Sequence, residues 1–212
     1  MASTKYSDIS SEVLPILAAF PPEPLVENAI KRAVIEFCTE SLIWKYLPDP
    51  IDIDAGEREY MIEIPPGAET AMVMNAAFDG DRITPQSTEW LDIELPGWGT
   101  DLATPKYFTQ VESNQIILAP IPDSTISGGL MLTIALRPQV SSSGFPKWIA
   151  NKYLYDIADG AAAKLMLMSG KPWTDAANGA YRKSQFDSAI AKARESSAKA
   201  LGRAVIRTTS YN

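Results

Sequence analysis

Apolar residues recur at helical spacing near the start of the chain. Between Tyr6 and Phe20 they stand three or four positions apart, which predicts a helix that Pro15 kinks or shortens. A second helix is predicted from the proline run at 21–24 to about Leu47, because the acidic residues there suit the positive end of a helix dipole. Its buried stripe comprises Ile30, Val34, Phe37, Cys38 and Ser41 or Leu42, with Trp44 and Tyr46 at its end.

The pattern changes to alternation after the break at Pro48-Asp49-Pro50. Apolar and polar residues then alternate, as they do in half-buried strands. Asp79-Gly80 is a strong signal for a two-residue hairpin turn, and Ser113-Asn114 predicts a second one. Together with further apolar runs, these segments predict five to seven short antiparallel strands, with a loop or short helix around residues 90–105.

Helical spacing returns after the polar linker at 141–144. Pro146 is predicted to open a long helix that Gly170 and Pro172 terminate, and Thr174-Asp175 to cap the last helix, which ends near Gly202. Small residues around Gly160 would let another helix approach closely. The apolar stripes of these two helices comprise Ala150, Tyr153, Ile157, Ala161, Leu165 and Met168, and Phe186, Ala189, Ile190, Ala193, Ser197, Ala200 and Leu201.

These elements predict an α+β fold. Helices from the two ends of the chain can bury their stripes only against each other, so residues 1–47 and 146–202 are expected to form an antiparallel helical bundle of two N-terminal and two C-terminal helices. Residues 48–145 would form an antiparallel β domain inserted into this bundle. Residues 203–212 contain few apolar side chains and are expected to form an extended, flexible C-terminal tail.

Charge is unevenly distributed along the 212 residues. The chain has 26 acidic and 19 basic side chains and a net charge of -7. Residues 48–145 carry fifteen acidic and four basic side chains, hence -11, whereas residues 146–212 carry five and eleven, hence +6. This division indicates parts that face different environments or each other. The acidic total argues against wholesale nucleic-acid binding. No apolar run approaches the roughly 18 residues that a membrane span needs, and the N-terminus lacks the profile of a secretory signal, so we expect a soluble protein that is not exported by a cleaved signal.

The residue types exclude several kinds of active site. Because the chain has no histidine, it cannot form Ser-His-Asp or Cys-His relays or histidine zinc sites. The single Cys38 lies in an apolar run, which predicts a buried and unreactive thiol. The acidic cluster that includes Asp52 and Asp54 lacks the spacing of a calcium loop and fits an exposed strand face. We therefore expect no enzyme activity, metal or cofactor. An acidic metal-dependent hydrolase is a less favoured alternative, and sequence-specific DNA binding ranks lower still, because no helix carries basic and amide residues on one face.

The order of motifs in the second half of the chain resembles the head-to-tail adaptor proteins of tailed bacteriophages. The series comprises Tyr107-Phe108, Asn114 to Pro122, Leu130 to Pro138, Phe145 to Trp148, Ile157 to Ala161, Lys171 to Asp175, Ala180-Tyr181 and Phe186. It covers about residues 105–195 in motif and the whole chain in architecture. Each motif alone is unspecific, and the resemblance rests on their order and spacing.

The resemblance implies a structural protein of the virion neck that is assembled in the host cytoplasm. Such adaptors form a ring, which follows the twelvefold symmetry of the portal protein, between the portal and the next tail or nozzle protein. Genomic DNA passes through the lumen without specific binding, and no membrane is involved. The alternative is another neck or tail component, such as a head-completion or tail-terminator protein.

Three groups of residues are candidates for the contacts of such a ring. The portal-docking role of the family maps here to the basic tail, with candidates Arg203, Arg207 and Tyr211. The charge division suits complementary faces of neighbouring subunits. The acidic candidates are Asp52, Asp54, Glu57 and Glu59, and the basic candidates are Lys192, Arg194 and Lys199.

Overall fold

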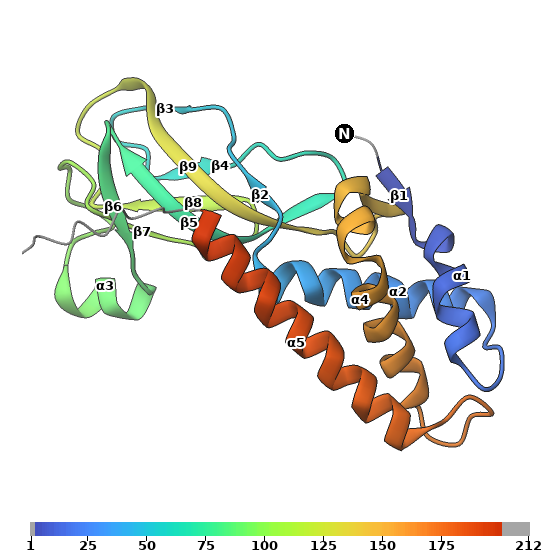
Figure 1. The fold of residues 1–212 in the computed structure, drawn as a ribbon. Helices are drawn as coiled ribbons and strands as arrows, with labels where there is room; N and C mark the ends of the chain where they lie inside the picture. The colour runs from blue at the N-terminus through green and yellow to red at the C-terminus, as the bar shows by residue number, and fades with distance from the viewer. Residues whose placement is uncertain (1–2, 201–212) are drawn as a thin grey trace, which may run out of the picture. The chain divides into compact units, whose positions relative to one another are not determined.

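The computed structural model describes residues 3–200 (Figure 1). Within this range the chain forms two compact units: residues 3–6 with 44–150, and residues 7–43 with 151–200. Five helices and a mixed β-sheet make the fold α+β, as the sequence predicts. The domain limits expected from the sequence stay a prediction. No helix between residues 3 and 200 has the length and apolar character needed to cross a membrane.

An eight-stranded sheet dominates the first unit. Its strands are β2 Lys45–Tyr46, β3 Ile51–Ile53, β4 Glu59–Met61, β5 Ala68–Phe78, β6 Asp81–Pro85, β7 Tyr107–Thr109, β8 Gln115–Ala119 and β9 Ile126–Pro138. They follow the order β2-β9-β5-β6-β7-β8-β4, and β3 also pairs with β9. The long strands β5 and β9 lie side by side (Figure 1). A separate two-stranded sheet joins β1, Ser3–Lys5, to β10, Gly144–Pro146.

The hairpin predicted at Asp79-Gly80 is confirmed. Phe78 at the end of β5 pairs with Asp81 at the start of β6, which leaves a two-residue loop. Asp79 and Gly80 have φ values of 47° and 85°, and a turn of this kind requires positive φ at both positions. Gly80 has no heavy atom within 4 Å of the position that a Cβ would take. Glycine is therefore favoured here by the positive φ of the turn and not by close packing.

The predicted turn at Ser113-Asn114 is wrong in length. β7 ends at Thr109 and β8 begins at Gln115, so the connection is longer than two residues. Asn114 has a φ of 67°, its side-chain oxygen accepts a 2.9 Å hydrogen bond from Thr70 N, and its carbonyl accepts one of 2.8 Å from Ile62 N. The connection is therefore held by hydrogen bonds to distant segments, and turn-forming residues in the local sequence do not predict such bonds.

The strand count and the antiparallel expectation also need correction. The described residues form ten strands instead of five to seven, and β6 pairs with β7 in parallel through Thr84 and Tyr107. Parallel neighbours need a crossover connection of roughly a dozen residues or more. Residues 86–106, which include the short helix α3, Thr88–Glu94, supply that crossover. This helix agrees with the loop or short helix expected there.

The second unit is helical. Its elements include α1, Ser10–Val13, and α2, Glu23–Ser41, followed by most of α4, Lys147–Met166, and by α5, Ala176–Ala200. Figure 1 shows α2 (light blue), α4 (orange) and α5 (red).

The two N-terminal helices are shorter than predicted. The single turn α1 lies between two 3₁₀ turns within residues 6–16, and Pro15, which cannot donate to a helical ladder, lies in the second of these turns. Phe20 is 76% exposed and does not belong to a buried stripe. α2 ends at Ser41 and not at Leu47, since Leu42 adopts a left-handed conformation with φ 53°. The following residues become β2.

The two C-terminal helices follow the prediction more closely. Asp175 caps α5, because its carboxylate accepts a 3.0 Å hydrogen bond from Asn178 N. α4 ends at Met166, before the predicted terminators, and its backbone leaves helical geometry at Tyr153, where φ is -126° and ψ is 24°.

The predicted apolar stripes make the core of this unit. The ring centroids of Phe37 and Tyr153 are 4.7 Å apart, and those of Phe37 and Phe186 are 6.1 Å apart, so α2, α4 and α5 meet at one aromatic cluster. A Cβ at Gly160 would lie 2.7 Å from the Phe186 ring, which confirms that the small residue lets α5 approach α4. The further arrangement of these helices as a bundle stays a prediction. The predicted position of Met168 in the buried stripe is wrong, because it lies beyond the end of α4 and is half-buried, and Leu201 lies outside the described residues. The buried stripe residues of this unit are Ile30, Val34, Phe37, Cys38, Ser41, Tyr153, Ile157, Ala161, Leu165, Phe186, Ala189, Ile190, Ala193 and Ser197, and Ala150 is buried in the first unit.

Candidate interaction surfaces

The acidic candidates lie on β3, on β4 and on the turn between them in the first unit. Asp52, Asp54, Glu57 and Glu59 are all exposed. The hydroxyl of Tyr60, a residue that sequence reasoning did not select, donates a 2.8 Å hydrogen bond to the carbonyl of Glu57 and lies 3.2 Å from that of Asp54. Burial and the nearby carboxylates of Glu57 and Asp54 raise the pKa of Tyr60, so its proton stays available for these bonds. This buried hydroxyl therefore fixes the turn that presents the acidic side chains.

The four carboxylates differ in how far they are already engaged. Asp52 Oδ1 accepts hydrogen bonds from Ser127 Oγ at 2.8 Å and from Gly128 N at 2.6 Å, and these bonds lower the pKa of Asp52. Glu57 Oε1 accepts from the backbone N–H of Arg58 and of Glu59. Glu59 accepts a 3.1 Å bond from Gln115 Nε2 and lies 3.4 Å from Arg58 Nε. The carboxylate of Asp54 makes no hydrogen bond or ion pair within the described residues, so it is the one of the four that is open to a partner.

Between residues 3 and 200, no three Asp, Glu, Cys or His side chains gather closely enough to hold a metal ion. The carboxylate of Asp52 already accepts hydrogen bonds from the Ser127 hydroxyl and from the Gly128 backbone N–H. The four acidic candidates thus form an exposed, negatively charged surface on two strands and the turn between them.

The basic candidates do not share one face of α5. Lys192 and Lys199 are seven residues apart and therefore lie on the same flank of the helix, whereas Arg194 projects from the opposite flank. Ala193 and Ser197, which are buried, lie between the two flanks. Lys199 forms an ion pair with Glu195 on its own helix. Lys192, in contrast, lines a pocket together with residues of α4.

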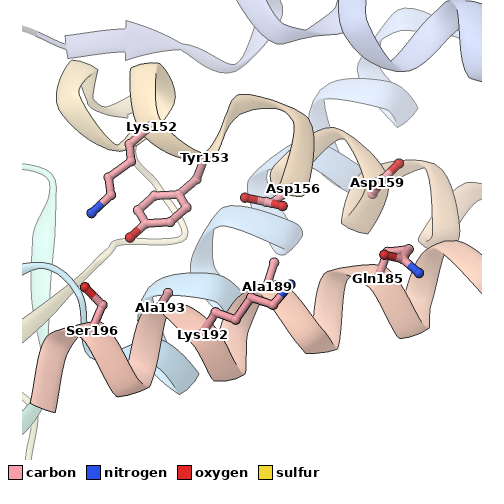
Figure 2. Close-up of a pocket in the computed structure, with 9 residues that line it drawn as sticks. All are labelled: Lys152, Tyr153, Asp156, Asp159, Gln185, Ala189, Lys192, Ala193 and Ser196. Atoms are coloured by element: carbon pink, nitrogen blue, oxygen red, sulfur yellow. The ribbon is translucent and has the colours of Figure 1, made fainter.

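Lys192 belongs to a polar pocket between α4 and α5, which we call the α4–α5 pocket. It has a volume of about 330 Å³. Figure 2 shows Lys152, Tyr153 and Asp156 extending from α4 toward α5, and Ala189, Ala193 and Ser196 on the facing helix. Ala189 and Ala193 are small enough to leave space between the helices at this level. The full lining comprises Lys152, Tyr153, Asp156, Asp159, Gln185, Ala189, Lys192, Ala193 and Ser196.

The break of α4 at Tyr153 brings polar groups to this pocket. The Tyr153 ring packs on Phe37, and the Lys152 ammonium lies 5.1 Å from the centroid of the same ring. Neither the Tyr153 hydroxyl nor the Ser196 hydroxyl makes a hydrogen bond within the described residues. One end of the pocket thus holds a cation and two hydroxyl groups that are free to donate (Figure 2).

The other end of the pocket carries the negative charge. Partial burial is the largest cause that raises the pKa of Asp156. The negative charge of Asp159 raises this pKa further, and the positive charge of Lys192 lowers it. Asp159 itself is neutralised by an ion pair with Arg182. Taking the Asp159–Arg182 pair as neutral, the lining retains the charges of Lys152, Lys192 and Asp156, and the pocket is positive by one unit.

The remaining sequence candidates have different outcomes. Arg203, Arg207 and Tyr211 lie outside the described residues. Cys38 is fully buried, and burial raises the pKa of its thiol to about 12, which confirms the prediction of a buried thiol with no tendency to ionise.

Two comparisons with known proteins bear on this geometry. The family model of the SU10 adaptor protein matches residues 4–208. A search of curated proteins gives no match to the chain.

Proposed function

Since the chain belongs to the SU10 adaptor protein family, we propose that it forms a ring between the portal and the tail of a phage particle and provides a conduit for the genome. The family membership agrees with the resemblance to head-to-tail adaptors of tailed bacteriophages, and it implies a structural component of the virion. The single observation that carries the proposal is the match of the family model over nearly the whole chain, residues 4–208.

The charge division supports a ring with unlike faces in contact. In a closed ring, one patch of each subunit meets a different patch of the next, so the two patches need complementary charge and not self-complementarity. Residues 48–145 carry a net charge of -11 and residues 146–212 one of +6. Exposed carboxylates on the β unit and the net positive α4–α5 pocket on the helical unit are suitable partners in such a contact.

The acidic surface also suits a DNA conduit. Carboxylates that line a lumen repel the phosphate backbone, so DNA slides through without being held, and non-specific affinity stays low. The portal contact is assigned to the basic segment with Arg203, Arg207 and Tyr211, whose cations suit an acidic surface of the portal. The opposite face of the ring would bind the next tail or nozzle protein.

The proposal is tested by mixing the purified chain with the portal protein. We expect stable complexes with a ring of about twelve copies on each portal, seen by mass photometry and negative-stain microscopy. The double charge reversal Arg203→Glu with Arg207→Glu should abolish portal binding, whereas reversal of the exposed Lys171 should leave it unchanged. A chain that stays monomeric with the portal at every salt concentration would refute the adaptor function.

Particles that lack this protein separate the adaptor from its nearest alternative. An adaptor is required between head and tail, so its loss should give DNA-filled heads that leak or carry no tails. Tails of abnormal length on otherwise complete particles would instead indicate a tail terminator and overturn the assignment.

A further inference from the structure

We propose that the α4–α5 pocket of one subunit binds the carboxylate of Asp54 from a second copy of this chain. This inference rests on the proposed ring and names a contact that would hold neighbouring subunits together. It starts from two unsatisfied groups on the described residues. One is a pocket with more positive than negative charge, and the other is an exposed carboxylate without a partner.

The pocket selects for an anion. Its lining contains the ammonium groups of Lys152 and Lys192 against one carboxylate, that of Asp156, since Asp159 is paired with Arg182. The Lys152 ammonium lies 5.1 Å from the centroid of the Tyr153 ring and makes no ion pair with any acid of residues 3–200. A partner cation would have to approach two lysines, whereas a partner carboxylate gains an ammonium that no acid within the described residues neutralises.

Hydrogen-bond donors stand at the same end of the pocket. The hydroxyl groups of Tyr153 and Ser196 have no hydrogen-bond partner within residues 3–200, and both line the pocket near Lys152 (Figure 2). A carboxylate accepts up to four hydrogen bonds. One ammonium and two hydroxyl groups thus match the acceptor capacity of a single Asp or Glu side chain, and hydrogen bonds to a charged group are the stronger ones.

Among the acidic candidates, Asp54 fits this role best. Asp52, Glu57 and Glu59 use their carboxylates on groups of their own unit. Asp54 occupies the turn that the Tyr60 hydroxyl holds in place, so its side chain is presented from a fixed backbone and loses little freedom on binding. A pocket of about 330 Å³ accommodates an Asp side chain together with part of its turn.

The test is a charge swap in the full chain, read out as ring assembly on the portal. Lys152→Glu and Asp54→Lys should each raise the chain concentration needed for half-complete rings at least about tenfold, because each opposes like charges across the contact. The double variant Asp54→Lys with Lys152→Glu restores the pair in reverse and should assemble within about threefold of the wild type. Matched controls are Lys171→Glu and Glu112→Lys, which change the same charges at exposed sites elsewhere.

Two further variants probe the pocket without reversing a charge. Asp156→Asn removes the negative charge that opposes the two lysines of the lining and should lower the concentration for half-complete rings. Tyr153→Phe keeps the ring that packs on Phe37 but removes the hydroxyl, and should raise that concentration severalfold. Thermal unfolding of each variant confirms that the fold is retained.

The outcomes distinguish this contact from the ring itself. If the wild type forms rings on the portal but the single reversals assemble equally well, the ring stands and the Asp54 contact is wrong. If Lys152→Glu weakens portal binding while Asp54→Lys does not affect assembly, the pocket binds the portal and the inference is overturned. Single variants that fail without recovery in the swap also overturn it. A wild type that forms no ring refutes the proposed function and, with it, this contact.

Discussion

The close approach of α4 and α5 at Gly160 makes a specific prediction about stability. In Gly160→Ala, the new Cβ would lie 2.7 Å from Cδ2 and Cε2 of Phe186, whereas nonbonded carbons ordinarily meet at about 3.5–4.0 Å. The Phe186 ring is 1% exposed and has Phe37 as a neighbour, so it cannot move aside into solvent. Overpacking of this kind costs about 1–3 kcal/mol, and the better helix propensity of alanine offsets about 1 kcal/mol of it.

We therefore expect Gly160→Ala to lower the free energy of unfolding by about 1 kcal/mol, measured by urea titration with circular dichroism. The control is the background Phe186→Leu, in which the smaller side chain makes room for the methyl group. In that background the steric term disappears and the alanine should stabilise the protein. The same change in unfolding free energy in both backgrounds would refute a clash with Phe186.

Three further predictions concern other parts of the chain. Gly80→Ala should cost about 1 kcal/mol of unfolding free energy, because φ is 85° and no packing is affected; Gly80→Asn should cost less, and equal losses in urea titrations would contradict this. Glu69→Gln removes the 2.8 Å ion pair with Arg137 on the neighbouring strand and should cost about 0.5–1 kcal/mol at low salt; a loss that is undiminished in 1 M salt would speak against an electrostatic origin. The thiol of Cys38 keeps its proton in the folded state up to a pKa of about 12 but ionises in the unfolded chain near 9.0. The burial of the Cys38 thiol therefore contributes fully to the free energy of unfolding below pH 9. Above pH 9 this contribution falls by about 1.4 kcal/mol per pH unit. The stability difference between the wild type and Cys38→Ala should shrink from pH 9 to pH 11, and a constant difference would exclude the burial effect.

Local periodicity predicted the buried faces of this fold well. The stripes of α2, α4 and α5 follow from apolar residues at helical spacing, which is enough to predict that Phe37, Ile157 and Phe186 are buried. The Asp79-Gly80 hairpin followed from backbone chemistry that only a few residue types allow. In both cases, the information lies within a few residues of the position concerned.

Long-range pairings were not predictable in the same way. Ser3–Lys5 shows no apolar alternation, and it becomes a strand because Gly144–Pro146 offers unpaired backbone groups. Residues 45–46 continue a helical pattern in sequence, yet pairing with β9 makes them a strand. The parallel pairing of β6 with β7 depends on the path of the crossover, which no local signal encodes.

The candidate surfaces were also predictable only in part. Their charges were evident from the sequence, but their availability was not, because it depends on hydrogen bonds to distant residues. Asp52 and Asp54 look equivalent in the sequence, and only the contacts with Ser127 and Gly128 distinguish them. Likewise Lys152 and Lys192 are brought to one pocket by the packing of two helices and by the backbone break at Tyr153.

The aromatic cluster of the helical unit has a consequence for synthesis of the chain. Phe37 lies against Phe186, a residue that leaves the ribosome 149 positions later. At about 5–20 residues per second, the apolar stripe of α2 waits for roughly 7–30 s before its final partner emerges. Residues 44–150 of the β-rich unit, and then α4, are made within that time, so the nascent α2 needs temporary cover, from a chaperone or from non-native contacts. The order of the elements along the chain thus sets the time at which this protein is most prone to aggregate.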